Sequence, residues 1–285
     1  MRILCADVYL TGKPHAEMKE GFQLMYAFRS LGVKCDIAGP GCEISELSIP
    51  RIAHLYDLIV ITENYPLHSR WKWWDWGSIQ TPKFFWAIDT HVLDCHNFIQ
   101  QGRINYVGFA IKRSMEQYKF PASMILHYAL STRHQYFPLP ESKIRDTVFL
   151  GSMITERRKE LCARFNIPNV SAFGEDYFKE MKRSKICFNN SITNDINAKF
   201  FEIMGSGSFM LTNYNQEIID FFDKSVEADL KACMYSTDEE IGEKIAYYLE
   251  HEEEREAIAK RLYDYVWANH TWESRCKQII SFVQK

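Results

Sequence analysis

The chain has 285 residues, of which 46% are hydrophobic and 25% charged, and these proportions are typical of a globular protein with one large or two ordinary domains. A formal net charge of −3 gives no general attraction for a phosphate backbone. The composition therefore argues against a nucleic-acid partner, although it leaves room for a local basic groove.

The cysteines are dispersed along the chain, and no two of them form a CxxC pair. Because a structural zinc site generally uses such close pairs, we expect no metal. Most of the cysteines lie within apolar runs, which predicts reduced and buried thiols. Residues 1–7 become polar too early for a signal peptide, and no apolar run approaches the length of a membrane span. A cytoplasmic location is therefore expected.

Short apolar runs alternate with helical patterns along the first half of the chain, which predicts βαβ units and a largely parallel sheet. Residues 17–31 carry an apolar stripe that includes Phe22 and Met25 and ends at Gly32, as expected for an amphipathic helix. No GxGxxG follows the first strand, which argues against an NAD enzyme. The expected strands are 2–7, 34–38, 58–62, 83–88 and 106–110.

The second half repeats this alternation after a segment, residues 136–143, that contains Pro138 and Pro140. Prolines remove backbone donors and favour an extended linker, so we expect domains at 1–140 and 141–285. Residues 237–240 have the form of a capping box that opens a helix through Leu249. The expected strands are 147–150, 169–173, 186–189, 209–212 and 233–235, and the last two expected helices are 252–268 and 273–283.

The most informative stretch is 195–212, which predicts a helix, a glycine stop and a short strand. Lys199 and Glu202 are three residues apart and so share one face of that helix. The polar run 189–194 precedes it, and a helix N-terminus attracts anions. A cation, a carboxylate and free backbone N–H groups would then converge, which suits a diphosphate and a ribose. The alternative is a surface helix with one charged pair, capped by Gly205 and Gly207.

This stretch resembles the C-terminal signature of glycosyltransferases with the GT-B fold, in particular the spore-maturation CgeB-like branch of the group 1 family. The resemblance runs from about residue 146 to the end, and its further matching segments are 148–158, 184–190, 243–259 and 270–275. It implies an α/β fold with two Rossmann-like domains, whose parallel sheets face a central cleft. It also implies that the last helix, about 271–285, crosses back to pack on the first domain.

The same resemblance implies transfer of a sugar from a nucleotide-diphosphate sugar to an acceptor hydroxyl, without a metal ion or other cofactor and with retention of configuration. The chain departs from the family at one position. Many group 1 enzymes carry two glutamates separated by seven residues, and the first would fall at Asn194 here, although Asp195 is adjacent. This departure motivates a second hypothesis, a non-catalytic module that binds a nucleotide or a glycan.

In the family, the residue matching Lys199 neutralises the leaving diphosphate and the one matching Glu202 accepts hydrogen bonds from ribose hydroxyls. Two further carboxylates follow expected strands. Glu217 either contacts the donor or caps the next helix, and Glu175 is within reach of a nucleobase in the same arrangement.

Gly151 and Ser152 end a strand, where a glycine lets the backbone approach a phosphate closely. Arg157 and Arg158 follow in the first turn of the next helix, and arginine binds phosphate oxygens through paired N–H donors. We choose Arg157 as the donor ligand. The alternative is an exposed pair of arginines on a charged helix.

Asp89 and His91 follow the strand 83–88, so they would lie at its carboxyl end. An aspartate two residues from a histidine can position or deprotonate an acceptor hydroxyl, and we assign both as catalytic. The alternative is a helix cap with a solvated histidine.

The segment 70–76 holds four of the chain's seven tryptophans. Trp73 and Trp74 could stack on the acceptor, or the rings could pack as a satellite cluster. His15 follows the first strand and could face the cleft, and loop packing is the alternative.

A phage-type enzyme that glycosylates hydroxymethylated pyrimidines in DNA is a more specific alternative. The compact length and the tryptophan-lysine segment motivate this hypothesis, while the mild acidity argues against it. Duplex binding with base flipping would need a basic track, for which Lys112, Arg113 and Lys119 are the candidates.

Overall fold

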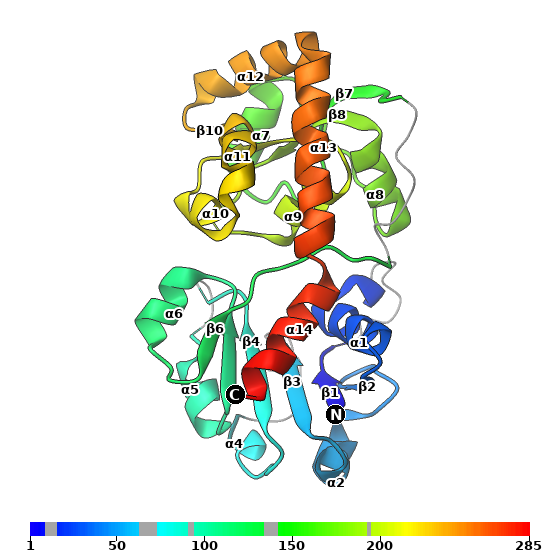
Figure 1. Ribbon diagram of the computed structural model, residues 1–285, viewed down its shortest axis with the longest axis vertical. Coiled ribbons are helices and arrows are strands. Elements are labelled where there is room, and N and C mark those ends of the chain that lie inside the picture. Colours follow the sequence, from blue (N-terminus) through cyan, green and yellow to red (C-terminus); the bar gives the residue numbers. More distant parts are fainter. Residues whose placement is uncertain (9–15, 63–72, 91–93, 134–141, 193–194) are drawn as a thin grey trace. The chain divides into compact units, whose positions relative to one another are not determined.

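The computed structural model describes residues 1–8, 16–62, 73–90, 94–133, 142–192 and 195–285. The chain forms two compact α/β units (Figure 1). Unit 1 comprises Met1–His127 and Trp272–Lys285, and unit 2 comprises Tyr128–Thr271. The first unit thus ends at His127, earlier than the boundary expected at residue 140. Most of the proline segment 136–143 lies outside the described residues.

Unit 1 contains a six-stranded parallel sheet with the order β2-β1-β3-β4-β5-β6. All five strands expected in this half are present, each within one residue of its expected end. The additional strand, β6, is short and only half-buried, so it has no apolar run by which sequence reasoning could find it. The strands are β1 (Arg2–Ala6), β2 (Lys34–Ala38), β3 (Leu58–Thr62), β4 (Lys83–Ala87), β5 (Tyr106–Phe109) and β6 (Ser123–Ile125).

Helices cover both faces of this sheet, because alternate strand residues point to opposite sides. On one face, Leu4, Ile59 and Phe85 belong to a buried apolar cluster with residues of the small helices. Those helices are α2 (Ile49–Ile52), η3 (Ala53–Leu55), α4 (Trp73–Trp76), α5 (His96–Gln101) and α6 (Lys112–Tyr118), and the turn η2 (Glu46–Ser48) precedes α2.

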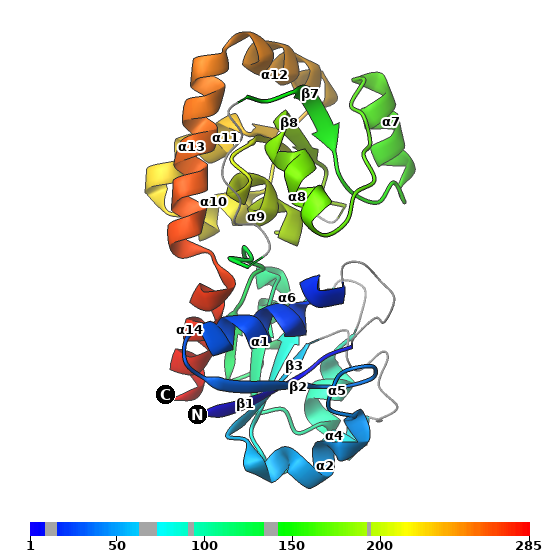
Figure 2. The same cartoon turned by 90° about the vertical axis from the view of Figure 1, so that its right-hand side faces the viewer.

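The other face is covered by α1 (Glu20–Ser30), which follows the short turn η1 (Ala16–Met18), and by the last helix, α14 (Trp272–Val283). Figure 2 shows α1 running alongside β1 and β2 of unit 1. Trp272 packs edge-on against Trp86, with ring centroids 5.4 Å apart. The Arg275 Nε, almost fully buried, donates to the His127 carbonyl at 2.9 Å. The last helix therefore packs on the first unit, as expected.

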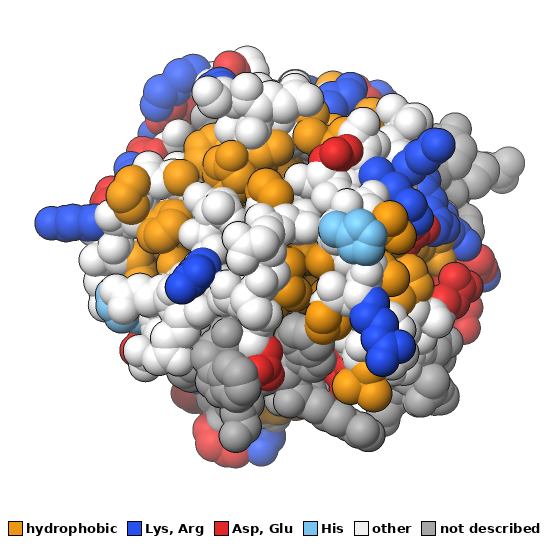
Figure 3. Space-filling model, turned by 90° about the horizontal axis from the view of Figure 1, so that it is seen from below, with side chains coloured by type: hydrophobic (Ala, Val, Ile, Leu, Met, Phe, Trp, Pro, Cys, Tyr) orange, Lys and Arg blue, Asp and Glu red, His pale blue; other side chains and the backbone are white. Residues whose placement is uncertain are grey.

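The tryptophan segment lies partly in α4. Trp76 is fully buried in the apolar cluster, so the packing alternative holds for this ring. The side chains of Trp73 and Trp74 lie outside the described part of the structure. Near α2, Leu47 and Leu55 are exposed. Figure 3, which looks onto this end of unit 1, shows hydrophobic side chains interspersed with polar and charged ones.

Unit 2 contains a four-stranded parallel sheet with the order β10-β9-β8-β7. The strands lie within two residues of four expected ones: β7 (Arg145–Phe149), β8 (Ser184–Asn189), β9 (Phe209–Asn213) and β10 (Met234–Tyr235). The strand expected at 169–173 is wrong, because only Asn169 bridges to Phe149. Val170 N–H donates a hydrogen bond to the Phe149 carbonyl at 3.0 Å. The segment then leaves the sheet, so that Phe173 is exposed.

Capping side chains mark the start of several helices of unit 2. Thr237 accepts from Glu240 N–H at 3.4 Å, which confirms the predicted cap. The reciprocal bond of the box is shifted by one residue, because the Glu240 carboxylate accepts from Ser236 N–H, at 2.8 Å, and not from the N–H of Thr237. The helix at Lys199 begins after the cap Asn197, later than residue 195. The elements are α7 (Glu156–Arg164), α8 (Glu175–Lys182), α9 (Ala198–Gly205), α10 (Gln216–Phe221), η4 (Lys224–Val226), α11 (Glu227–Ala232), α12 (Asp238–Glu250) and α13 (Glu252–Asn269).

All the cysteines are free and all except Cys42 are buried, which confirms the predicted buried thiols. Among the described residues, no helix is both long enough and apolar enough to cross a bilayer. Within the same residues, no group of three or more histidine, cysteine, aspartate or glutamate side chains is placed to hold a metal ion.

Each sheet has a point where the direction of strand addition reverses. In unit 1 this point lies between β1 and β3, and in unit 2 it lies between β7 and β8, because the segment at Asn169 pairs on the other side of β7. In open α/β sheets, ligands bind beyond the carboxyl ends of the strands at such points. The loops after β7 and β8 are therefore the expected position of a ligand-binding site.

Candidate functional site

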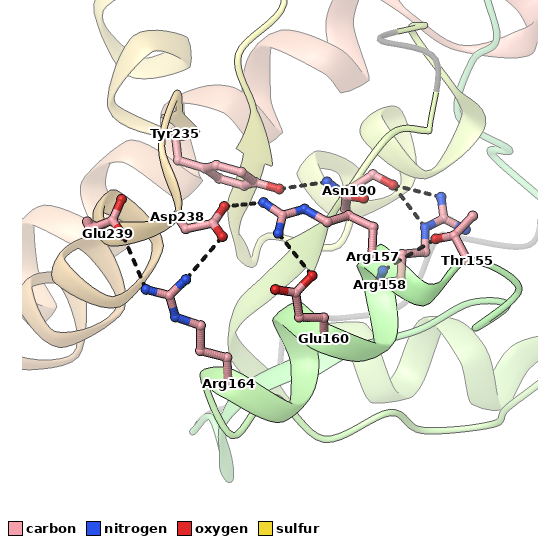
Figure 4. Close-up of polar contacts among 9 residues, drawn as sticks. All are labelled: Thr155, Arg157, Arg158, Glu160, Arg164, Asn190, Tyr235, Asp238 and Glu239. Atoms are coloured by element: carbon pink, nitrogen blue, oxygen red, sulfur yellow. Dashed lines mark hydrogen bonds and ion pairs between the residues drawn. The ribbon is translucent and has the colours of Figure 1, made fainter.

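Arg158 joins the two loops at the reversal point of unit 2, and Figure 4 shows its bonds to Asn190. Its Nη1 donates to the Ser152 carbonyl, after β7, at 3.1 Å. Its Nε and Nη2 donate to the Asn190 carbonyl, after β8, at 3.0 and 2.7 Å. The side chain is 9% exposed, and this burial lowers the pKa of Arg158. A buried cation thus fixes the spacing of the two loops.

Arg157, the arginine chosen from the sequence, points elsewhere. Its guanidinium pairs with Glu160 at 3.2 Å and with Asp238 at the start of α12. Arg164 binds the same Asp238 carboxylate at 3.1 Å, so an exposed ion-pair network ties α7 to α12 (Figure 4). The structure therefore brings Arg158, and not Arg157, to the strand ends. Sequence spacing could not separate two adjacent helix residues whose orientations depend on the neighbouring loops.

Lys199 reaches the same strand ends from the first turn of α9. Its Nζ lies 4.5 Å from the centroid of the Phe149 ring, at the end of β7. A Cβ at Gly151 would overlap the Lys199 ammonium, so the close approach requires a glycine there. Burial lowers the pKa of Lys199 to about 8, and the charge of Glu202 opposes that shift. The structure thus brings the predicted Gly151 and Lys199 together.

Glu202 lies one helical turn beyond Lys199 on α9. Its Oε2 accepts from the Tyr177 hydroxyl of α8 at 2.8 Å. Burial, and then the charge of Glu202, raise the pKa of Tyr177, so this tyrosine stays a donor over the physiological range. Sequence reasoning missed Tyr177, because no local pattern links it to a glutamate on another helix.

Amide side chains surround these charges at the ends of the strands. Asn169 Nδ2 donates to the Gly151 carbonyl at 3.1 Å, and Asn190 Nδ2 donates to the Tyr235 hydroxyl at 3.0 Å. Asn213 Oδ1 accepts from Ser191 N–H at 2.8 Å. The first bond ties Asn169 to the loop after β7, and the other two tie the loop after β8 to the last residues of β10 and β9. Hydrogen bonds therefore hold these loops in place at the carboxyl edge of the sheet.

The two remaining carboxylates of the donor hypothesis occupy helix starts. Asn215 caps α10 by accepting from the N–H of Glu217 at 2.9 Å, so Glu217 is not the cap itself. A donor contact of Glu217 stays a prediction. Glu175 is the first residue of α8 and forms an ion pair with Lys179 at 3.4 Å.

In unit 1, Asp89 follows β4 and is exposed, while Thr90 donates to Ser114 at 2.6 Å. The Asp94 carboxylate accepts from His96 N–H at the start of α5, at 2.9 Å. Residues 91–93 lie outside the described residues, so the capping alternative for Asp89 and Thr90 stays open. His91 and His15 lie outside the described residues, so their assigned roles stay predictions.

Asp7, which was not singled out from the sequence, lies at the reversal point of unit 1, beyond β1. Its carboxylate is fully buried and accepts from the N–H groups of Val8, at 2.6 Å, and of Gly21. A Cβ at Gly21 would overlap Asp7, so the start of α1 approaches it only through a glycine. Burial, followed by the charge of Glu20, raises the pKa of Asp7 to about 7.

The raised pKa of Asp7 predicts how the stability of the protein depends on pH. Its pKa rises from 3.8 to about 7 on folding, so its stabilising contribution is present below pH 4 and is lost as the pH rises through 7. We expect the unfolding free energy of wild type, relative to Asp7→Asn, to fall by about 2–4 kcal/mol between pH 4 and 7.5. Urea denaturation of both proteins across this range measures the difference.

Only the difference in unfolding free energy between wild type and Asp7→Asn is informative. The pKa of His127 is lowered to about 4 by burial, so this histidine adds stability as the pH rises from 4 to 6.5 and opposes Asp7. Because both proteins contain His127, its contribution cancels. A stability difference that does not change with pH would contradict the assignment of a protonated Asp7.

Comparisons with known proteins agree with this geometry. Residues 153–281 match the family model described as Glycosyl transferase-like. No curated protein matches the sequence. An alpha-glucosyltransferase in complex with UDP superposes with a TM-score of 0.72 at 8% identity, covering 100% of both chains. HepE of Anabaena, in complex with UDP-glucose, superposes with a TM-score of 0.67 at 12% identity, covering 100% of this chain and 99% of its own.

A third similar structure is the BGT protein of T4 phage in complex with UDP-glucose. It has a TM-score of 0.63 at 11% identity, and the match covers 100% of this chain and 98% of the phage chain. Likeness at these identities establishes the fold. The chain therefore has the GT-B fold of glycosyltransferases, as the resemblance implied.

Proposed function

We propose that the chain is a glycosyltransferase that moves a sugar from a nucleotide-diphosphate sugar to an acceptor hydroxyl, with unit 2 binding the donor. The observation that carries this proposal is the meeting of Gly151, Arg158 and Lys199 at the reversal point between β7 and β8. The glycosyltransferase-like match of residues 153–281 and the UDP-bound structural neighbours support it.

In this mechanism the bond between the sugar and the diphosphate breaks, and the leaving phosphate oxygen takes up negative charge. Lys199 stabilises that charge with its ammonium group. Because the pKa of Lys199 is about 8 in the free protein, a bound diphosphate would raise it and draw a proton from solvent. We propose that this cation replaces a metal ion at the leaving group, so that no cofactor is needed.

Other residues hold the donor and the loops around it. Glu202 accepts from the ribose hydroxyls, and Tyr177 fixes the orientation of its carboxylate. Arg158 is a positioning residue, since three of its nitrogen atoms already donate to backbone carbonyls. The acceptor hydroxyl gives its proton to a base, for which Asp89 and His91 are the candidates.

We propose retention of anomeric configuration, from the resemblance of residues 195–212 to group 1 enzymes. The GT-B fold itself does not decide between the two outcomes, since the structural neighbours include an alpha- and a beta-glucosyltransferase. Analysis of the product anomer by NMR would settle the point once the donor is known.

A DNA acceptor is the second candidate, and one comparison favours it. An alpha-glucosyltransferase in complex with UDP and a 13-mer DNA containing a HMU base superposes with a TM-score of 0.70 at 8% identity, covering 100% of both chains. In this chain Lys112, Arg113 and Lys119 are exposed at the two ends of α6. Sugar transfer to hydroxymethylated DNA, measured beside transfer to neutral oligosaccharides, separates the two acceptor classes.

A screen of nucleotide-sugars for thermal stabilisation tests the donor proposal. A ligand that binds only the folded state raises the melting temperature, and a concentration of 100 times Kd adds about 2.7 kcal/mol. We expect one nucleotide-sugar to raise the melting temperature by several degrees without added metal, and Lys199→Ala to lose this shift. No shift with any nucleotide-sugar would overturn the proposal. A shift without donor hydrolysis or transfer would favour the non-catalytic module.

A further inference from the structure

Unit 1 contains a cavity that is lined by none of the site residues assigned above. It has a volume of about 290 Å³ and lies between α1 and the residues that follow β2. Met25 and Ile37, each 4% exposed, form its apolar floor. The half-buried rings of Phe22 and Tyr26, with centroids 6.4 Å apart, line one wall. The cavity therefore offers two aromatic surfaces above an apolar base.

Charged side chains of both signs stand at the rim. Glu17, Arg29 and Glu43 line the cavity and are exposed. The guanidinium of Arg29 is held in place, because its Nε donates to the Cys35 carbonyl at 2.7 Å and its Nη2 lies 3.7 Å from the Asp36 carboxylate. The rim thus combines carboxylate acceptors with a fixed donor and has little net charge.

The position in the fold is one where ligands bind. The cavity lies just beyond the carboxyl end of β2, which is the favoured side of a parallel sheet. Cys42, which also lines it, lies within 3.4 Å of the Asp7 carbonyl, so this loop is tied to the reversal point of unit 1. Gly41 takes a φ of 77°, and this left-handed turn carries the chain around the cavity.

We propose that this cavity binds one sugar ring of a neutral acceptor glycan. A pyranose has an apolar C–H face that suits the rings of Phe22 and Tyr26, and hydroxyls around its edge that suit the rim. A wholly apolar ligand would leave the rim charges desolvated and unpaired, which is costly. A strongly anionic ligand would meet the carboxylates of Glu17 and Glu43, and a strongly cationic one would meet the guanidinium of Arg29. The acceptor role rests on the proposed function, whereas the binding of a sugar does not.

Saturation-transfer NMR with the full-length protein tests the site in the absence of any donor. The probes are maltose, cellobiose, lactose and N,N′-diacetylchitobiose. We expect at least one to bind, and Tyr26→Ala to weaken its binding about tenfold through the lost ring face. Glu43→Gln keeps the shape of an exposed side chain and should weaken binding severalfold by removing charge-assisted hydrogen bonds. Tyr247→Ala, an exposed tyrosine of unit 2, is the matched control and should change nothing.

The outcomes separate this inference from the proposed function. If no disaccharide binds, or if Tyr26→Ala and Glu43→Gln both bind as wild type does, the sugar site is overturned, whatever the donor screen shows. If a disaccharide binds in this manner and no nucleotide-sugar binds, the sugar site stands while the transferase and its acceptor role fail. With an active enzyme, the two substitutions should raise the acceptor KM and leave the donor KM unchanged.

Discussion

Lys199→Ala is expected to lower the turnover number with a nucleotide-sugar about 10²–10³-fold, the effect of removing one group that stabilises developing negative charge. Lys199 is the cation that approaches Gly151 at the end of β7, and its burial strengthens the interaction with a diphosphate. The fold should survive, because a buried ammonium with a pKa lowered to about 8 costs the folded state energy when charged. Steady-state kinetics and circular dichroism measure the two effects.

The matched control is Lys159→Ala, which removes an exposed lysine of the same unit that pairs only with Glu156 among the described contacts. Its turnover should equal that of wild type. The pH dependence gives a second readout. As the pH rises through about 8, Lys199 loses its proton, so the affinity of wild type for the nucleoside diphosphate of its donor should fall, while Lys199→Met should show no such fall. Turnover that is nearly unaltered in Lys199→Ala would show that the donor site lies elsewhere.

The fold could be predicted from the sequence where burial makes the signal strong. The central strands of parallel sheets are covered on both faces, so β3 (Leu58–Thr62) reads as a continuous apolar run and was expected with its observed bounds. Two segments differ from the prediction, because they lie at sheet edges. β6 is half-buried, and the segment at Asn169 pairs only briefly with β7 before Phe173 turns to solvent.

The candidate site was predicted where its residues share one element. Lys199 and Glu202 are three apart on α9, and helical spacing alone places them on one face. The residues that were missed interact across elements. Tyr177 reaches Glu202 from α8, and Asp7 reaches Gly21 at the start of the next helix. Such pairs depend on how helices pack against the sheet, which no local pattern in one sequence reports.

Arg158→Ala is expected to have the second largest effect. It should lower both the stability of the protein and its affinity for the donor. The substitution leaves the carbonyls of Ser152 and Asn190 without their buried donor, and breaking such a network costs about 2–4 kcal/mol of unfolding free energy. Because these carbonyls belong to the loops after β7 and β8, the loops should also lose their fixed spacing. We expect the Kd for the nucleoside diphosphate of the donor to rise about 10–100-fold.

Arg157→Ala is the natural control, because it removes the neighbouring arginine from an exposed ion pair with Asp238 and leaves the loops unchanged. Urea denaturation should find its stability close to that of wild type, and titration calorimetry should find the same affinity for the nucleoside diphosphate of the donor. The comparison decides between two adjacent arginines that the sequence could not separate. If Arg157→Ala weakened binding of the nucleoside diphosphate more than Arg158→Ala, the diphosphate would be bound by an arginine that leaves Asp238 when the donor arrives. The first choice made from the sequence would then be correct.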